Sequence, residues 1–182
     1  MKSLDLPHCC SLLGLPAELR CTIYEYVLVA SEHVLVTAQL QQPPLSLVSR
    51  QTRSEAITIW YNKNIFAFDI WDCDATLLKA FLLHADATGH GQKNVRIMNK
   101  GKKSWTNLKT WCRYVFDDKA FYVRRVHDMS ARDAVITAAQ DMAVKFSRRI
   151  ASNNKEAVWS ECEEMLDTLR FAVGKLDAEW LD

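Results

Sequence analysis

The sequence predicts a helix-rich α+β fold. Several long segments repeat apolar residues every three or four positions, as helices do, and a few short segments alternate apolar and polar residues, as half-buried strands do. Of the 182 residues, 49% are hydrophobic and 25% are charged, which is ordinary for a globular protein. A chain of this length buries enough surface to fold without disulfides or a structural metal.

The first predicted helix covers residues 16–29. Pro16 suits its first position, because proline fixes φ there and no amide is needed, and Glu18 favours the positive end of the helix dipole. The apolar residues of this segment recur at helical spacing, at Leu19, Ile23, Tyr26 and Val27. The spacing therefore predicts an amphipathic helix.

Strand and helix signals alternate in the next part of the chain. Residues 32–40 are rich in β-branched side chains and predict a short strand, which Pro43 and Pro44 end because proline lacks the amide that a sheet needs. A second helix is predicted over 45–61, and a half-buried strand over 66–70.

Further elements follow this strand. Asp74 can cap a short helix, residues 94–98 are a candidate strand, and Ser104 opens a third strong helix. The apolar positions of the third helix are Trp105, Leu108, Trp111, Cys112, Val115 and Phe116.

Two long helices are predicted over 130–151 and 154–173. Ser130 followed by Asp133 is typical of a capping box, and Gly174 is expected just after the second helix. The short joint between the helices predicts an antiparallel helical hairpin. Its apolar side chains are expected in the core, and the alternative is a homodimer seam formed by Met142, Phe146, Trp159 and Met165.

Basic residues are concentrated in the middle of the chain. Residues 93–125 carry ten basic and two acidic residues, although the net charge of the whole chain is only +1. Trp105 and Trp111 fall on the apolar side of their helix, which argues against a stacking surface for single-stranded nucleic acid. A solvated face or a patch for an acidic partner, including the chain's own acidic C-terminal helix, is expected instead at Lys102, Lys103, Lys109 and Arg113.

Neither secretion nor catalysis is indicated by the sequence. The six cysteines have no framework spacing, no apolar run reaches membrane length, and the N-terminus is a poor signal peptide, so we expect an intracellular protein, cytoplasmic or nuclear, with reduced thiols. Cys-x-x-Cys and His-Glu-x-x-His motifs do not occur, and the pair Gly89 and Gly91 lacks the third glycine of a dinucleotide fingerprint. We therefore expect no catalytic residues, no metal and no cofactor.

Two motifs near the start of the chain carry a resemblance to a known family. The pattern Leu-Pro-x-Glu-Leu and the pattern Leu-x-x-Val-Ser-Arg-x-x-Arg are followed by Trp-Tyr-x-x-Asn-x-Phe-x-Phe. The matching residues of the two patterns are Leu15, Pro16, Glu18, Leu19, Ile23 and Leu28, and then Leu45, Val48, Ser49, Arg50 and Arg53. Residues 14–70 therefore resemble the F-box-like domain of fungal proteins.

This resemblance implies a non-enzymatic docking module. An F-box-like helical unit over 14–70 would bind a Skp-type adaptor of a cullin ubiquitin ligase, and a helix-rich body over 71–182, packed with it as one globular domain, would hold an unknown protein target. The implied partner-binding residues are Leu15, Pro16, Leu19, Ile23, Leu28 and Val48. The alternative is a stand-alone interaction or scaffold protein, homodimeric in one version, without a ligase role. A small-ligand enzyme would need a deep pocket with convergent polar groups.

Overall fold

Helices make up most of the structure and accompany a small sheet, so the predicted helix-rich α+β fold is confirmed. The computed structural model describes residues 11–90, 94–118, 130–150 and 154–181. Its helices are α1 (Ala17–Leu28), α2 (Arg50–Lys63), α3 (Thr76–Ala87), α4 (Trp105–Asp117), α5 (Ala131–Ser147) and α6 (Lys155–Gly174). Its strands are β1 (Val34–Leu35), β2 (Phe66–Trp71) and β3 (Val95–Lys100). Short 3-10 helices include η1 (Leu12–Gly14), η2 (Pro44–Leu47) and η5 (Ala178–Leu181).

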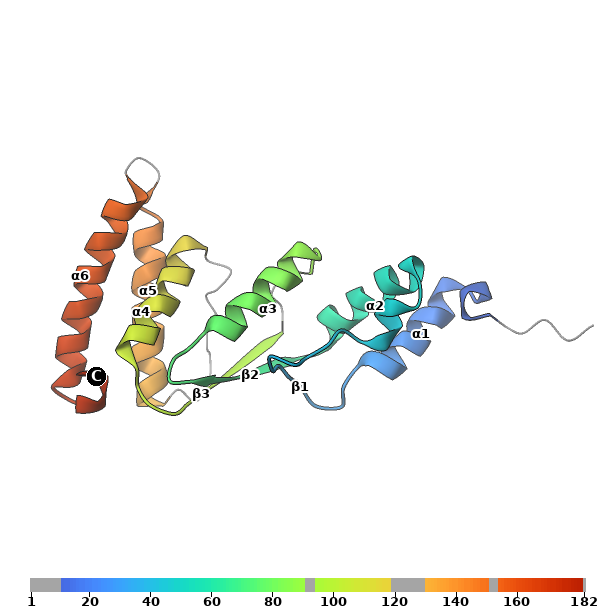
Figure 1. The fold of residues 1–182 in the computed structure, drawn as a ribbon, viewed down its shortest axis with the longest axis horizontal. Coiled ribbons are helices and arrows are strands. Elements are labelled where there is room, and N and C mark those ends of the chain that lie inside the picture. The colour runs from blue at the N-terminus through green and yellow to red at the C-terminus, as the bar shows by residue number, and fades with distance from the viewer. Residues whose placement is uncertain (1–10, 91–93, 119–129, 151–153, 182) are drawn as a thin grey trace, which may run out of the picture.

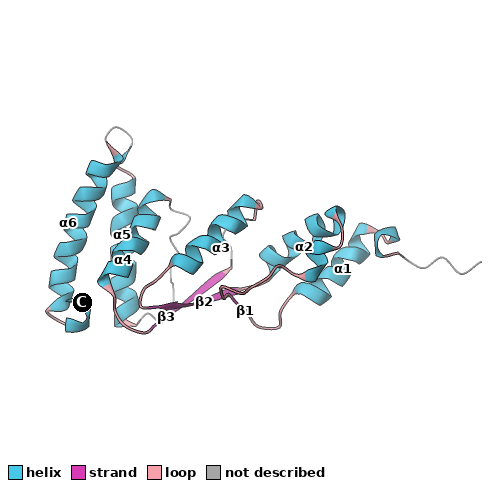
Figure 2. Ribbon diagram, in the orientation of Figure 1, coloured by secondary structure: helices cyan, strands magenta, loops and turns pink. Residues whose placement is uncertain are grey.

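The molecule is elongated. Helices α1 and α2 lie at one end, α5 and α6 lie side by side at the other, and the sheet lies between them (Figure 1). Helix α3 covers one face of the sheet (Figure 2), where Phe81 packs against Phe66 and Phe68 with ring centroids 4.9 and 5.2 Å apart.

The sheet is parallel throughout, in the order β1-β2-β3. Helices α2 and α3 form the two crossovers that parallel neighbours require. Strand β2 is central, and three of its buried residues, Phe66, Phe68 and Ile70, occupy alternate positions on one face. The predicted strands over 66–70 and 94–98 are confirmed, each with small changes at its ends.

Side-chain caps mark the starts of α2, α4 and α5. The Ser49 and Ser104 hydroxyls accept the amides of Thr52 and Asn107, at 3.0 and 3.3 Å. The predicted capping box of α5 is present, with Ser130 and the N3 residue Asp133 bonded reciprocally. The helix expected over 45–61 therefore begins only at Arg50, after η2 and its cap.

The strand expected over 32–40 is much shorter in the structure. Only Val34–Leu35 pair with the sheet, because the chain turns away after Val36, where the Leu40 amide bonds the Thr37 carbonyl at 3.0 Å. β-Branched composition favoured an extended backbone here, and the turn overrode it.

The buried apolar residues form two clusters. A small one joins α1 and α2 through Tyr24, Leu28, Ala56 and Ile59, and Trp60 packs against both clusters. The large one runs from the sheet to α6 and contains Trp105, Trp111 and Trp180. Strand β2 lies at the end of the predicted unit over 14–70 and pairs with β3 of the predicted body over 71–182. Both ranges therefore contribute residues to the large cluster.

Helices α5 and α6 form the predicted hairpin (Figure 1). The expected helix end at Ala151 and the joint Ser152-Asn153 lie outside the described residues. Gly174 is the last helical residue of α6, and a Cβ there would lie 2.2 Å from Leu181 Cδ2, so η5 folds tightly back onto the helix. This places Trp180 edge-on against Trp105, with ring centroids 5.9 Å apart.

Candidate partner-binding surface

Helix α1 is held against α2 by charged groups. Arg20 is buried, and its Nε and Nη2 donate to the two carboxylate oxygens of Glu55 at 3.0 and 2.6 Å. The Arg20 Nη1 group donates to the Leu15 carbonyl at 2.5 Å, which fixes the chain just before the helix. The hydrogen bonds from Arg20, with one from Gln51, lower the pKa of Glu55 from 4.5 to about 2.

A buried asparagine holds the other end of the pair. The Asn64 side-chain amide donates to the carbonyls of Leu28 and Trp60, both at 3.0 Å, and its oxygen accepts the Ala30 amide at 2.7 Å. Three backbone groups at the ends of α1 and α2 are satisfied by this one side chain.

The two helices run in the same direction. Arg20 of α1 contacts Glu55 of α2, and farther along Glu25 lies 3.5 Å from Lys63. The starts of α1 and α2 are therefore neighbours, as the helical pair at one end of the molecule shows (Figure 1).

The apolar stripe predicted for the first helix faces outward. Its inner face consists of Arg20, Tyr24 and Leu28, whereas the residues at helical spacing in the sequence are exposed. The exposed fractions are 53% for Leu19, 39% for Ile23, 91% for Tyr26 and 60% for Val27. We call these four residues the α1 stripe. The periodicity predicted the spacing of these residues but not the side of the helix that faces solvent.

The other residues implied by the resemblance are distributed unevenly. Pro16 is exposed and Leu15 is half-buried, while Val48 is exposed next to η2. Leu28 is a correction: it is only 5% exposed and packs in the small α1–α2 cluster, so it is not available to a partner. The exposed motif residues therefore gather around the starts of α1 and α2.

The predicted basic patch is mostly paired within the chain. Lys103 bonds Asp177 and Glu179, the latter at 2.8 Å. Lys109 lies 2.6 Å from Glu163 of α6.

Arg113 completes this set of ion pairs. It forks onto the Glu156 carboxylate at 2.9 and 2.6 Å and also reaches Asp117 at 3.1 Å. Three of the four patch residues thus bind the acidic C-terminal helices, which was one of the expected alternatives. Lys102 is exposed and has no ion pair among the residues that the structure describes.

The predicted homodimer seam is largely part of the core. Met142, Phe146 and Trp159 pack against the large cluster, and Trp159 lies 5.1 Å from the Phe116 ring. Only Met165 of that set is exposed.

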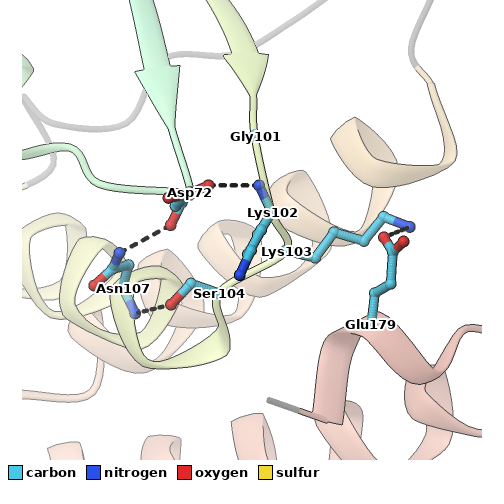
Figure 3. A pocket seen from close by; sticks show the side chains of 7 residues that line it. All are labelled: Asp72, Gly101, Lys102, Lys103, Ser104, Asn107 and Glu179. Carbon is cyan, nitrogen blue, oxygen red and sulfur yellow. Dashed lines mark hydrogen bonds and ion pairs between the residues drawn. The ribbon is translucent and has the colours of Figure 1, made fainter.

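A cavity of about 540 Å³ lies where β2 and β3 end and α4 begins (Figure 3). Its lining consists of Asp72, Gly101, Lys102, Lys103, Ser104, Asn107 and Glu179. Several polar groups here already bond one another: Asn107 donates to the Asp72 carbonyl at 2.9 Å, and Lys103 pairs with Glu179. Asn107 and Lys103 of this lining are therefore already engaged within the chain.

Two further features bear on the type of site. Within the described ranges, no cluster of three or more His, Cys, Asp or Glu side chains is suited to hold a metal ion, and no helix is long and apolar enough to cross a membrane. The described cysteines, Cys21, Cys73, Cys112 and Cys162, are free thiols. Burial raises the pKa of Cys73 to about 11 and that of Cys162 to about 11, so these thiols are poor nucleophiles.

Comparison with family models, curated proteins and solved structures gives no match for this chain.

Proposed function

We propose that this chain is a non-enzymatic binding adaptor that docks on a Skp-type adaptor protein of a cullin ubiquitin ligase through α1. One observation carries the proposal. Pro16, Leu19 and Ile23 belong to the motif that resembles F-box-like domains, and all three are exposed to solvent.

The α1 stripe has the form of a helix that docks into a groove. Apolar anchors at i, i+4 and i+7 on one exposed face are the usual way in which a helix binds a partner protein. Burying one Leu or Ile contributes roughly 1.5–3 kcal/mol relative to leaving it in water. Exposed apolar side chains that lie next to one another on one face often mark a site of protein–protein interaction.

The test is titration of the purified chain with the Skp-type adaptor from the same organism, followed by isothermal calorimetry. The double variant Leu19→Asp/Ile23→Asp is expected to abolish measurable binding, because it places two charges in the docking face. Both side chains are exposed, so the melting temperature is expected to stay within a few degrees of wild type.

The matched control is Leu83→Asp/Leu176→Asp, which changes two exposed leucines on α3 and beyond α6. It is expected to bind like wild type. Equal binding by both double variants, or none by the wild-type chain, would overturn the proposal. Light scattering on the same samples separates the scaffold alternative, since a homodimer held by the α1 stripe would dissociate in the first variant only.

A further inference from the structure

The central strand of the sheet is longer than one of its two neighbours. Strand β3 pairs with β2 along its whole length, from Phe66 to Trp71. On the other side, β1 pairs only with the start of β2, through Phe66 and Ala67, and the chain then turns away after Val36. Within the part of the chain that the structure describes, the second half of β2 therefore has no strand on the β1 side.

The backbone directions follow from the hydrogen bonds at the ends of this ladder. On one side, the Phe66 amide donates to Asn94 at 2.8 Å and the Asp72 amide to Lys100 at 3.0 Å. Alternate residues of a strand face alternate neighbours, so the even-numbered residues of β2 bond toward β3.

The odd-numbered residues face the β1 side. The carbonyls of Ile65 and Ala67 accept the amides of Val34 and Val36, both at 2.8 Å. Beyond Ala67 this series of bonds stops.

Asp69 and Trp71 continue the odd-numbered series without a strand beside them. In the described part of the chain, neither the amide and carbonyl of Asp69 nor the amide of Trp71 has a backbone partner on this side. The Trp71 carbonyl already accepts the Asp74 amide at 2.8 Å. We call this segment, residues 69–71, the bare edge.

A hollow of about 310 Å³ adjoins the bare edge. It is lined by Asp69, Trp71, Asp72, Asp74, Leu77 and Asn107. Trp71 is 59% exposed, and the Oδ1 atom of Asp69 has no hydrogen-bond partner among the described residues.

The hollow is negatively charged. Lys100 balances one of its three carboxylates, through a 2.7 Å contact with Asp69 Oδ2. Among the described residues, the Asp72 and Asp74 carboxylates accept backbone amides and a hydroxyl, which leave their charges in place. Lys100 Nζ also lies 5.9 Å from the centroid of the Trp71 ring. The two carboxylates that Lys100 does not reach, those of Asp72 and Asp74, favour a further cationic side chain.

We propose that the bare edge binds an extended, basic segment of a partner protein, which adds a strand to β2 and places a Lys or Arg side chain in the hollow. Only an extended chain offers amides and carbonyls at the spacing of Asp69 and Trp71. A second copy of this chain fits poorly, because it would bring its own acidic hollow to the same edge. The inference does not depend on the function proposed for α1, since it uses different residues.

The test uses a fluorescein-labelled Lys-Val-Lys-Val-Lys-Val peptide and the full chain, followed by fluorescence anisotropy. In two N-methylated versions of the peptide, either the odd-numbered or the even-numbered residues lack their amide hydrogens. Methylation of the residues whose amides face β2 is expected to weaken binding roughly tenfold or more, because it removes backbone hydrogen bonds. The peptide methylated at the alternate residues is expected to bind as before. The charge-reversed peptide Glu-Val-Glu-Val-Glu-Val is expected not to bind.

A second readout locates the peptide on the strand. Amide hydrogen exchange is expected to slow at Asp69 and Trp71 on binding and to stay unchanged at Asp72, whose amide is already bonded to Lys100. Asp74→Asn is expected to weaken binding while keeping an oxygen that accepts the Thr76 amide just before α3, whereas the control variant Asp86→Asn, near the end of α3, leaves binding unchanged.

Three results would overturn the proposal. They are absence of peptide binding, equal affinity for the two N-methylated peptides, and protection of Asp69 and Trp71 in the free protein that grows with protein concentration. The last result would assign the edge to a second copy instead.

Discussion

The two ends of the molecule distribute polar and apolar side chains in opposite ways. In the α1–α2 pair, the Arg20–Glu55 ion pair and Asn64 lie between the helices, and the α1 stripe faces solvent. At the other end, tryptophans fill the interior, and ion pairs such as Lys109–Glu163 lie at the surface between α4 and α6. The C-terminal end therefore presents ion pairs to solvent, whereas the N-terminal end presents an apolar stripe.

The difference also predicts where stability resides. Buried apolar area is the main favourable term in folding, and the large cluster holds far more of it than the four residues of the α1–α2 cluster. The N-terminal pair instead depends on a few directional bonds, which make the arrangement specific without adding much net stability.

The largest effect is expected from Trp105→Ala. Trp105 is fully buried against Trp180, and its loss leaves a cavity that typically costs roughly 3–5 kcal/mol. Denaturant unfolding followed by circular dichroism measures this free energy. Trp105→Phe is the control and is expected to cost clearly less, because the indole N–H has no acceptor among the described residues. Equal losses for the two variants would contradict the packing described here.

A smaller and more local effect is expected from Asn64→Ala. The change leaves the Ala30 amide and two carbonyls without their hydrogen-bond partner. Each buried group left unsatisfied lowers the free energy of unfolding by roughly 1–3 kcal/mol. Hydrogen exchange is expected to quicken in α1 while the amides of α4 keep their protection. Asn62→Ala, an exposed neighbour, serves as the control. If the amides of α1 and α4 both exchanged faster in Asn64→Ala, the two ends would unfold together, and the predicted difference in their stability would be wrong.

The smallest effect is expected from titrating Glu55. Its pKa is about 2 in the folded chain and 4.5 ordinarily, so its pair with Arg20 stabilises the fold fully above pH 4.5, and this contribution is lost as the pH falls toward 2. The pair lies near solvent, which screens it.

Acid melting curves test the Glu55 prediction. The wild-type chain is expected to lose more stability between pH 4.5 and 2 than Glu55→Gln, which cannot titrate. Parallel curves for the two proteins would show that the pair contributes nothing.

Local signals in the sequence predicted a good part of the fold. Ser104 and Ser130 located the starts of α4 and α5, because a hydroxyl that accepts a backbone amide acts within three residues of the chain. The apolar positions of α4 were also predicted, since every apolar residue of that helix falls on one side and only one packing direction is open.

The direction of α1 could not be predicted in this way. Apolar residues occur on two faces of this helix. The face that packs inward carries Arg20, which pairs with Glu55 of another helix. The parallel sheet depends in the same way on contacts between distant segments, such as Val34 with Phe66. One sequence gives the spacing of such residues but not the partner that each will meet.

The position of Trp180 has a consequence for how the chain folds during synthesis. The apolar residues of the α1–α2 cluster end at Trp60 and the bonding residue Asn64 follows directly, so this pair can assemble early on the ribosome. The large core lacks one of its tryptophans until residue 180 has emerged and η5 has closed on Gly174. The end that carries the α1 stripe can thus be formed before the end that carries most of the buried apolar surface is complete.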